Sequence, residues 1–186
     1  MINREWIKLT VSLKGKIKHI SHNDFLSSLK VSISKFLKLN LKNFVTLVEP
    51  LKSNQWVAEL AHYRLGFKSP VYGRLGEENA FMFSLAMQEK AYANEEENLK
   101  NIVLFDDGSF SGNQLHNHIK TIGNLCPKST VHVIVPFITK AAVKKITSIE
   151  NVLYKIYYDK IILTLKSSYS QPNEGFSFLS KITDIF

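Results

Sequence analysis

Cysteine is nearly absent from this sequence of 186 residues, in which Cys126 stands alone. A single cysteine excludes an intrachain disulfide framework and a cysteine-based zinc site, and it favours a reducing, cytoplasmic location. Leu115, Ile119 and Ile122 precede Cys126 at helical spacing. We therefore expect a thiol that packs on the apolar face of a helix, rather than a nucleophile.

Long apolar runs are absent as well. No stretch reaches the length of a membrane span, and the first residues lack the apolar core and cleavage site of a signal peptide. We therefore expect no membrane partner. The hydrophobic content of 45%, with 11% aromatic residues, argues against disorder, and the length suits one domain over residues 1–186.

Acidic residues are few compared with basic ones. The 16 Asp and Glu residues against 24 Lys and Arg residues give a formal net charge of +8, which favours anionic partners such as phosphorylated metabolites or nucleic acids. A basic nucleic-acid-binding surface is an open alternative for the first 45 residues. The lysines of that region are Lys14, Lys16, Lys18, Lys30, Lys35, Lys38 and Lys42.

Strand-like and helix-like segments alternate along the chain. The patterns predict strands over 6–13, 43–49, 102–105 and 130–137, and a strand or hairpin within 152–166 that turns near Asp159 and Lys160. They predict helices over 21–39, 56–64, 77–94 and 140–149, and a further helix that begins near Asn113. The expected fold class is α/β, with a mostly parallel central sheet between flanking helices in a Rossmann-like, three-layer arrangement.

Three further assignments follow from this order of elements. Residues 43–137 would form the core, and residues 1–42 could form an N-terminal flap or hood. The segment 66–76 carries glycines, a proline and the basic residues Lys68 and Arg74, which is typical of a mobile loop that covers a site.

The segment 101–114, NIVLFDDGSFSGNQ, carries the clearest functional pattern. Four apolar residues predict a buried strand, and Asp106 and Asp107 then fall at its carboxyl end, where open α/β sheets place their ligands. Small residues follow, and their backbone N–H groups could converge on an anion beside the start of a helix. These small residues are Gly108, Ser109, Ser111 and Gly112.

Three other nucleotide or phosphate motifs do not match. A Walker B strand would need a G-x-x-x-x-G-K-[ST] loop, which the chain lacks. Haloacid dehalogenase-type phosphotransferases need acids two residues apart, but Gly108 occupies the place of the second acid. No G-x-G-x-x-G follows a strand, so the dinucleotide-binding fingerprint is missing too.

The stretch 103–114, VLFDDGSFSGNQ, resembles the signature of the type I phosphoribosyltransferases, in which four apolar residues, two acids and a short small-residue loop lead into a helix. The resemblance implies that Asp106 and Asp107 are catalytic and bind the ribose hydroxyls of phosphoribosyl pyrophosphate. It also implies that the loop wraps the 5′-phosphate. The implied phosphate-binding residues are Gly108, Ser109, Phe110, Ser111, Gly112, Asn113 and Gln114.

The resemblance extends to the preceding strand and its loop. It implies that Lys52, Ser53, Asn54 and Arg74 receive the pyrophosphate, and that the basic loop over 66–76 closes over the site. It further implies Mg²⁺ carried by the pyrophosphate ligand and its waters, with no dedicated protein metal cage. Transfer would displace pyrophosphate from C1 of the ribose through a cation-like transition state.

Two positions depart from the family pattern. Phe110 stands where relatives often carry Asp, Thr or Ala, and Gln114 replaces a hydroxyl residue. These changes indicate a divergent member with a different acceptor, or a noncatalytic module that senses a phosphorylated ligand or acts through partner surfaces. The acceptor and the oligomeric state are not predicted, and a homo-oligomer is open.

Four other residues outside the motif have simpler interpretations. We expect His116 and His118 at the surface of the helix that follows the motif, because they alternate with its apolar positions. His132 lies inside a strand and should be a buried histidine with hydrogen-bond partners. Trp56 is expected to anchor the core.

Overall fold

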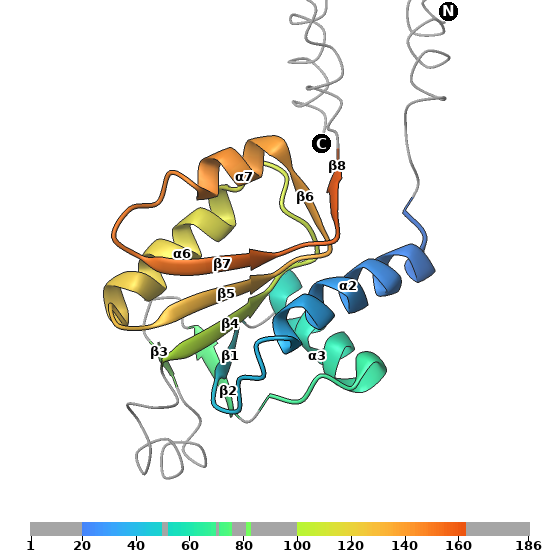
Figure 1. The fold of residues 1–186 in the computed structure, drawn as a ribbon, viewed down its shortest axis with the longest axis horizontal. Coiled ribbons are helices and arrows are strands. Elements are labelled where there is room, and N and C mark those ends of the chain that lie inside the picture. The colour runs from blue at the N-terminus through green and yellow to red at the C-terminus, as the bar shows by residue number, and fades with distance from the viewer. Residues whose placement is uncertain (1–19, 50–51, 70, 76–80, 83–99, 163–186) are drawn as a thin grey trace, which may run out of the picture.

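The computed structural model describes residues 20–49, 52–69, 71–75, 81–82 and 100–162 (Figure 1). Strands and helices alternate through these ranges, as the sequence predicts. The helices are α2 (His22–Leu37), α3 (Ser53–Leu65), α6 (Asn113–Leu125) and α7 (Lys140–Ile146). The strands are β1 (Val45–Val48), β2 (Val71–Leu75), β3 (Phe81–Met82), β4 (Asn101–Phe105), β5 (Thr130–Ile134), β6 (Phe137–Thr139), β7 (Leu153–Tyr157) and β8 (Lys160–Ile162).

The main sheet has the strand order β3-β2-β1-β4-β5-β7. The pairs β1–β2, β1–β4, β4–β5 and β5–β7 are parallel, and the pair β2–β3 is antiparallel. Strands β6 and β8 form a separate parallel pair. The predicted α/β class with a mostly parallel central sheet is therefore confirmed.

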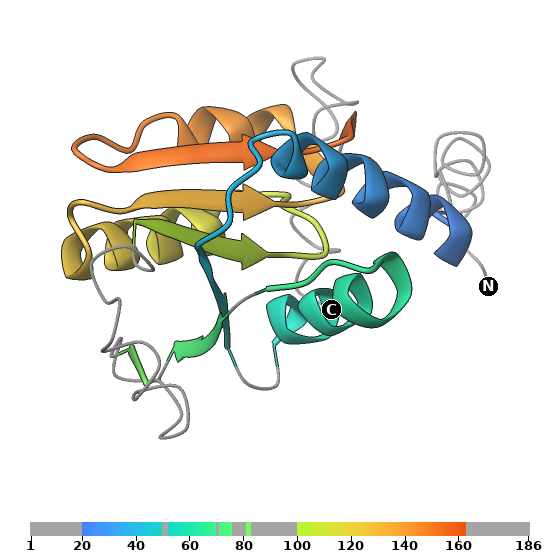
Figure 2. The same cartoon turned by 60° about the horizontal axis from the view of Figure 1, so that its bottom comes forward.

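Helices cover both faces of the sheet (Figures 1 and 2). The apolar residues of α6 and α7 pack with Ile102 and Leu104 of β4 on one face. Those of α2 and α3 pack with Val103 and Phe105 on the other. Because successive side chains of a strand point to opposite faces, one apolar strand supplies both cores, which is the three-layer arrangement.

Helix α2 begins at a capping box. The Ser21 hydroxyl accepts the Asp24 amide at 3.1 Å, and Asp24 Oδ2 accepts the Ser21 amide at 3.2 Å, which satisfies two N–H groups at the helix start. Leu29, Ile33 and Phe36 are buried against the sheet. The predicted helix over 21–39 is thus confirmed, and the predicted strand over 6–13 lies outside the described residues.

The predicted loop over 66–76 is wrong at residues 71–75, which form β2 beside β1, with Arg74 opposite Val48. Gly73 lies buried inside this strand opposite Leu47, and the parallel pairing with β1 holds the strand in place. The predicted helix over 77–94 is wrong at Phe81 and Met82, which form β3. The rest of that segment lies outside the described residues.

The segment 130–137, predicted as one strand, belongs to two strands. Strand β5 ends at Ile134, and β6 begins at Phe137 after Pro136, which has no N–H to continue a ladder. The predicted strand within 152–166 is confirmed by β7, but the alternative of a hairpin there is wrong. Strand β7 pairs in parallel with β5, and β8 pairs in parallel with β6, so both segments pass from the main sheet to the second sheet.

The order of connections places a topological switch point between β1 and β4. From β1 the chain passes through α3 to β2 on one side, whereas from β4 it passes through α6 to β5 on the other. The carboxyl ends of β1 and β4 therefore diverge into helices on opposite faces of the sheet. In open α/β sheets this crevice is where ligands bind.

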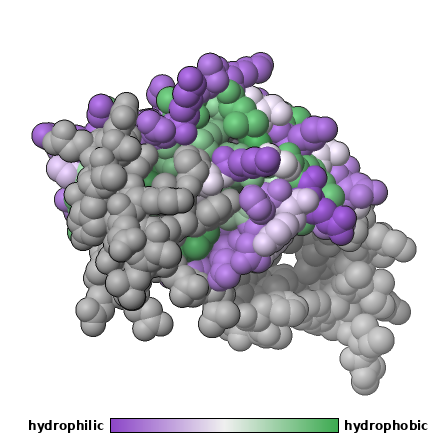
Figure 3. Space-filling view, turned by 90° about the horizontal axis from the view of Figure 1, so that it is seen from below, coloured by the Kyte–Doolittle hydropathy of each residue, from purple (hydrophilic) through white to green (hydrophobic). Residues whose placement is uncertain are grey.

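The side of the molecule formed by α2 and α3 carries exposed apolar residues among polar ones (Figure 3). Leu37 of α2 and Trp56 and Tyr63 of α3 are exposed. Among the described helices, none is long and apolar enough to cross a membrane.

Candidate functional site

Asp106 and Asp107 follow the carboxyl end of β4, as the sequence predicts, and the strand order places them at the switch point, where they occupy different environments. Asp106 continues the sheet, since its amide donates to the Ile134 carbonyl at 3.1 Å, and only 4% of the residue is exposed. Asp107 is half-buried and lines an open pocket. Asp107 is therefore the acid of the pair that a ligand can reach directly.

The carboxylate of Asp106 is held from both sides. Its Oδ1 accepts the Ser53 hydroxyl at 2.7 Å and the Asp107 amide at 3.0 Å. Burial raises the pKa of Asp106 to about 6, the Ser53 hydrogen bond opposes this shift, and the negative charge of Asp107 adds to it. The Ser53 contact joins the start of α3 to the end of β4, so the predicted pyrophosphate loop and the two acids do lie together.

The loop after Asp107 leads into the amino end of α6. Gly112 is the N-cap residue with a φ of +78°, a left-handed conformation that glycine adopts without strain. The first intrahelical bond is donated by His116 to the Gly112 carbonyl at 2.9 Å, so the amides of Gln114 and Leu115 precede it. The N-cap residue Gly112 makes no side-chain capping bond and no acid stands in the first turn, although the Asn113 amide donates to Ser111 Oγ at 3.3 Å. This end of the helix therefore favours an anion.

Contacts with the second sheet and α7 fix the shape of this loop. The Ser109 amide donates to the Phe137 carbonyl at 3.0 Å, and the Thr139 amide donates to the Ser109 carbonyl at 3.0 Å. The Thr139 hydroxyl donates to the Phe110 carbonyl and also accepts the Ala142 amide, which caps α7. The Ser109 amide is thus already used, and the donors that remain for a ligand follow it in the loop.

The start of α3 is a second helix terminus at the same edge. The predicted turn of Lys52, Ser53 and Asn54 is in fact the N-cap and first two residues of α3. Lys52 is exposed and its side chain makes no capping bond. Asn54 is buried, and its Oδ1 accepts the Glu49 amide at 3.0 Å, so Asn54 shapes the connection between β1 and α3.

His118 is not the surface residue that the sequence predicted. Its side chain is half-buried, and Nε2 lies 3.3 Å from the Glu49 carboxylate beyond the end of β1. Burial lowers the pKa of His118, and the charge of Glu49 opposes the shift. The helical pattern could not reveal this pair because Glu49 follows β1, which is distant from α6 in the sequence.

His132 and Cys126 follow their sequence interpretations. His132 is buried in β5, with Nδ1 2.9 Å from the Tyr157 hydroxyl and Nε2 3.0 Å from Asn101 Oδ1. Burial lowers the pKa of His132 to about 4, so the ring is neutral. Cys126 packs against the core beneath α6, and burial raises the pKa of its thiol.

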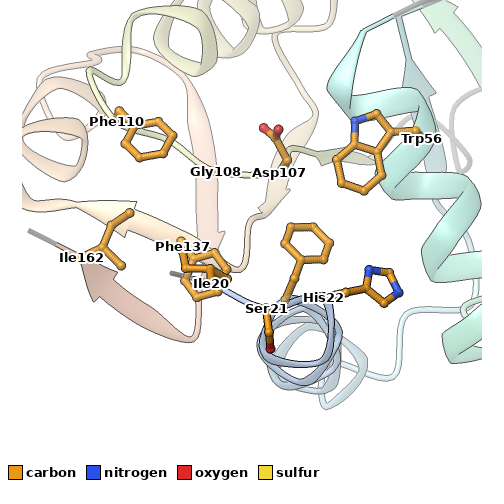
Figure 4. A pocket seen from close by; sticks show the side chains of 10 residues that line it. Ile20, Ser21, His22, Trp56, Asp107, Gly108, Phe110, Phe137 and Ile162 are labelled. Atoms are coloured by element: carbon orange, nitrogen blue, oxygen red, sulfur yellow. The ribbon is translucent and has the colours of Figure 1, made fainter. Parts of the chain in front are cut away.

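A pocket of about 330 Å³ opens beside Asp107 and Gly108 (Figure 4). Its other lining residues come from distant parts of the chain, and they include Ile20, Ser21, His22, Phe25, Trp56, Phe110, Phe137 and Ile162. Trp56 is 45% exposed and faces this pocket, so the prediction that it anchors the core is wrong. The sequence did not identify the pocket, because the aromatic residues belong to α2, α3 and β6 and share no local motif.

The described residues contain no group of three or more His, Cys, Asp or Glu side chains that could hold a metal ion. Asp107 offers a reachable carboxylate, which suits a Mg²⁺ ion that keeps most of its waters and arrives with a phosphorylated ligand.

Comparison with solved structures gives matches of low identity. A hypothetical protein from Neisseria gonorrhoeae solved with bound ppGpp is 17% identical, with a TM-score of 0.47, over 80% of this chain and 89% of that one. Orotate phosphoribosyltransferase from Aeropyrum pernix is 15% identical, with a TM-score of 0.47, over 74% and 72%. Xanthine-guanine-hypoxanthine phosphoribosyltransferase from Helicobacter pylori is 12% identical, with a TM-score of 0.44, over 75% and 90%.

No curated protein matches the sequence. A family model does: the model described as PRTase-CE matches residues 12–182, which include every described element. The phosphoribosyltransferase-like resemblance of the segment 103–114 is confirmed at the level of the family. Because the match spans nearly all of the 186 residues, the chain belongs to the PRTase-CE family.

Proposed function

We propose that the protein binds phosphoribosyl pyrophosphate, or a related phosphorylated ribose, at the switch point between β1 and β4, and transfers the phosphoribosyl group to an acceptor. One observation carries this proposal: the amino end of α6, with Gly112 as its N-cap residue, follows Asp106 and Asp107 after a short small-residue loop. The 5′-phosphate would lie in this loop and accept from the amides around Gly112 and Gln114. Asp107 would accept from the ribose hydroxyls.

The pyrophosphate would lie toward α3. The amino end of that helix and the exposed ammonium group of Lys52 both favour negative charge. Asp106 would not touch the ligand; by accepting the Ser53 hydroxyl it would hold the start of α3 in place. Mg²⁺ bound to the pyrophosphate would offset charge on the leaving group.

In the transfer step, the nucleophilic atom of the acceptor forms a bond to C1 of the ribose while the bond from C1 to the pyrophosphate oxygen breaks. The bonding pair leaves with pyrophosphate, and the proton of the acceptor passes to water. The chain's contribution is orientation and electrostatic stabilisation, since Asp107 holds the ribose and the two helix ends hold its phosphates.

Calorimetric titration with phosphoribosyl pyrophosphate and Mg²⁺ tests the binding proposal. We expect saturable binding that Asp107→Asn weakens by about tenfold or more, which corresponds to about 1.4 kcal/mol. We expect Lys52→Ala to weaken binding less, because Lys52 is exposed. Glu150→Gln is the matched control. Glu150 is exposed and precedes the amino end of β7, whereas the proposed site lies at the carboxyl ends of β1 and β4.

The absence of any binding by the natural protein would refute the proposal. A second measurement, pyrophosphate release with a panel of acceptors, separates transfer from binding alone. Binding without release across the panel would favour the noncatalytic, ligand-sensing module instead.

A further inference from the structure

Glu49 is a junction between the two helix ends of the proposed site. It directly follows Val48, the last residue of β1. The Glu49 amide donates to Asn54 Oδ1 at 3.0 Å, and the Glu49 carbonyl accepts the Lys52 amide at 3.2 Å. Both partners belong to the start of α3. The backbone of Glu49 is therefore bonded to the first residues of that helix.

The side chain of Glu49 contacts the other helix, α6. Its Oε2 lies 3.3 Å from Nε2 of His118, and the two side chains are 26% and 17% exposed. His118 lies in the second turn of α6, just beyond the residues proposed to hold the 5′-phosphate. Helices α3 and α6 pack on opposite faces of the sheet. The pair thus links one helix to the start of the other around the carboxyl end of β1.

The charge state of His118 fits a positional role. Burial lowers its pKa from the ordinary value of 6.5, the charge of Glu49 opposes the shift, and the charge of Lys52 adds to it. The ring is therefore neutral at pH 8. With its hydrogen on Nε2, the neutral ring donates to the Glu49 carboxylate, and such a bond is both strong and directional. The pair can fix a distance without bringing a further cation to the phosphates.

We propose that His118 is a positioning residue, which acts through Glu49 to hold the start of α3 at a fixed distance from the amino end of α6. This inference rests on the proposed function, in which one ligand has phosphates at both helix ends. Ser53 is already bonded to Asp106 at the end of β4, and the His118–Glu49 pair adds a second anchor from the other face of the sheet. A ligand that spans both ends depends on their spacing, whereas a ligand that meets one end does not.

The test compares three ligands at pH 8 with Mg²⁺: phosphoribosyl pyrophosphate, ribose 5-phosphate and pyrophosphate. Calorimetry measures the first, and protein-observed NMR titration measures the two weaker ones. His118→Leu keeps apolar volume but removes the donor. We expect it to weaken phosphoribosyl pyrophosphate at least about fivefold and to change the other two by less than about twofold, because each helix end keeps its own donors. Equal weakening of all three ligands, or unchanged binding of phosphoribosyl pyrophosphate, would overturn the inference.

A conservative variant and a double-mutant cycle identify the contact. His118→Gln places an amide N–H where the ring donates, so its affinity for phosphoribosyl pyrophosphate should stay within about twofold of the natural protein. In a Glu49→Met background, His118→Leu should cause less than about a twofold further loss, because its partner is already gone. A loss in His118→Gln as large as in His118→Leu, or an undiminished loss in the Glu49→Met background, would overturn the inference.

His116→Leu is the matched control. His116 lies on the same helix, and its Nδ1 is 3.4 Å from Oδ1 of the neighbouring Asn117 rather than near β1. The same replacement there should leave all three affinities within about twofold of those of the natural protein. A fivefold loss of phosphoribosyl pyrophosphate binding in His116→Leu as well would assign the effect to α6 in general and overturn the inference.

Hydrogen exchange without any ligand separates this inference from the proposed function. His118→Leu should speed exchange of the amides at residues 52–55 at least about fivefold, whereas His116→Leu should not. If the natural protein binds phosphoribosyl pyrophosphate and His118→Leu changes neither exchange nor affinity, the positioning role alone is refuted. Faster exchange in His118→Leu, in a protein whose natural form does not bind phosphoribosyl pyrophosphate, would refute the proposed function and with it the role of the pair in spacing two phosphates.

Discussion

Asp106 and Asp107 show how the fold separates two identical neighbours. The adjacent acids and the loop after them could be predicted from the sequence, because a buried strand followed by acids and small residues is a local pattern. The different environments of the two acids could not be predicted from the sequence. Asp106 is enclosed by Ser53 of α3 and by the ladder to β5, and both contacts depend on strand order rather than on neighbouring residues.

The raised pKa of Asp106 predicts a pH-dependent cost in stability. The folded state raises the pKa from 3.8 to about 6, so stability is fully present below pH 3.8 and is lost as the pH rises through 6. A shift of roughly two units corresponds to about 3 kcal/mol. Asp106→Asn should recover up to that amount at pH 8 and little at pH 4, because an amide oxygen can still accept from Ser53.

Urea unfolding at pH 4 and pH 8 measures the difference in free energy of unfolding between the natural protein and Asp106→Asn. Asp107→Asn serves as the control, since Asp107 is half-buried and its replacement should produce no comparable gain. An equal effect of Asp106→Asn at both pH values would contradict the assignment of the raised pKa to burial of this carboxyl. A gain in stability together with weaker ligand binding would identify Asp106 as a residue kept for function.

Among the elements, those with strong local patterns were predicted. Helix α2 has a capping serine and a continuous apolar face, and α6 has apolar residues at helical spacing before Cys126. Strand β2 was missed because its glycine and the proline before it are turn residues, whereas the neighbouring edge of β1 decides its conformation. The predicted hairpin failed because parallel pairing with distant strands replaced a local turn.

Two glycines of α6 allow the stability of the helix to be separated from the shape of the loop. A methyl group on Gly112 would lie 2.8 Å from Ala142 Cα and 2.9 Å from its carbonyl oxygen, and the φ of +78° adds strain. Gly112→Ala should therefore cost about 2–4 kcal/mol and push the loop away from α7. We expect the affinity for phosphoribosyl pyrophosphate to fall at least about tenfold, because the amides around residue 112 would move.

Gly123→Ala is the matched control at the other end of the helix. Its methyl group would meet the Val152 side chain at 2.5 Å, so the variant should also be destabilised, by about 1–2 kcal/mol once better helix propensity is included. This position lies far along α6 from the loop, so binding should be retained. Chemical unfolding and calorimetry measure both quantities. An equal loss of affinity in the two variants would mean that general destabilisation, rather than loop geometry, controls binding.

At the scale of the whole molecule, the sequence predicted the class of the sheet but not its strand order. Alternating strands and helices indicate parallel pairing with crossovers. No local sequence pattern places β1 beside β4, and it is this pairing that brings Ser53 against Asp106.

The alternative of a nucleic-acid-binding surface in the first 45 residues stays a prediction, to be tested by the salt dependence of binding after charge reversal of Lys14, Lys16 and Lys18.

The switch point predicts that one ligand should stabilise two distant segments together. Phosphoribosyl pyrophosphate carries a phosphate at each end of its ribose, and the amino ends of α3 and α6 lie on either side of the paired acids. Hydrogen exchange with the ligand and Mg²⁺ should therefore show increased protection both at residues 52–55 and at residues 109–115. Inorganic phosphate is the control, and it should protect residues 109–115 alone because a single phosphate cannot span both helix ends. Protection of only one segment by the full ligand would contradict a site shared across the switch point. Joint protection requires the neighbouring carboxyl ends of β1 and β4 to act as one binding surface.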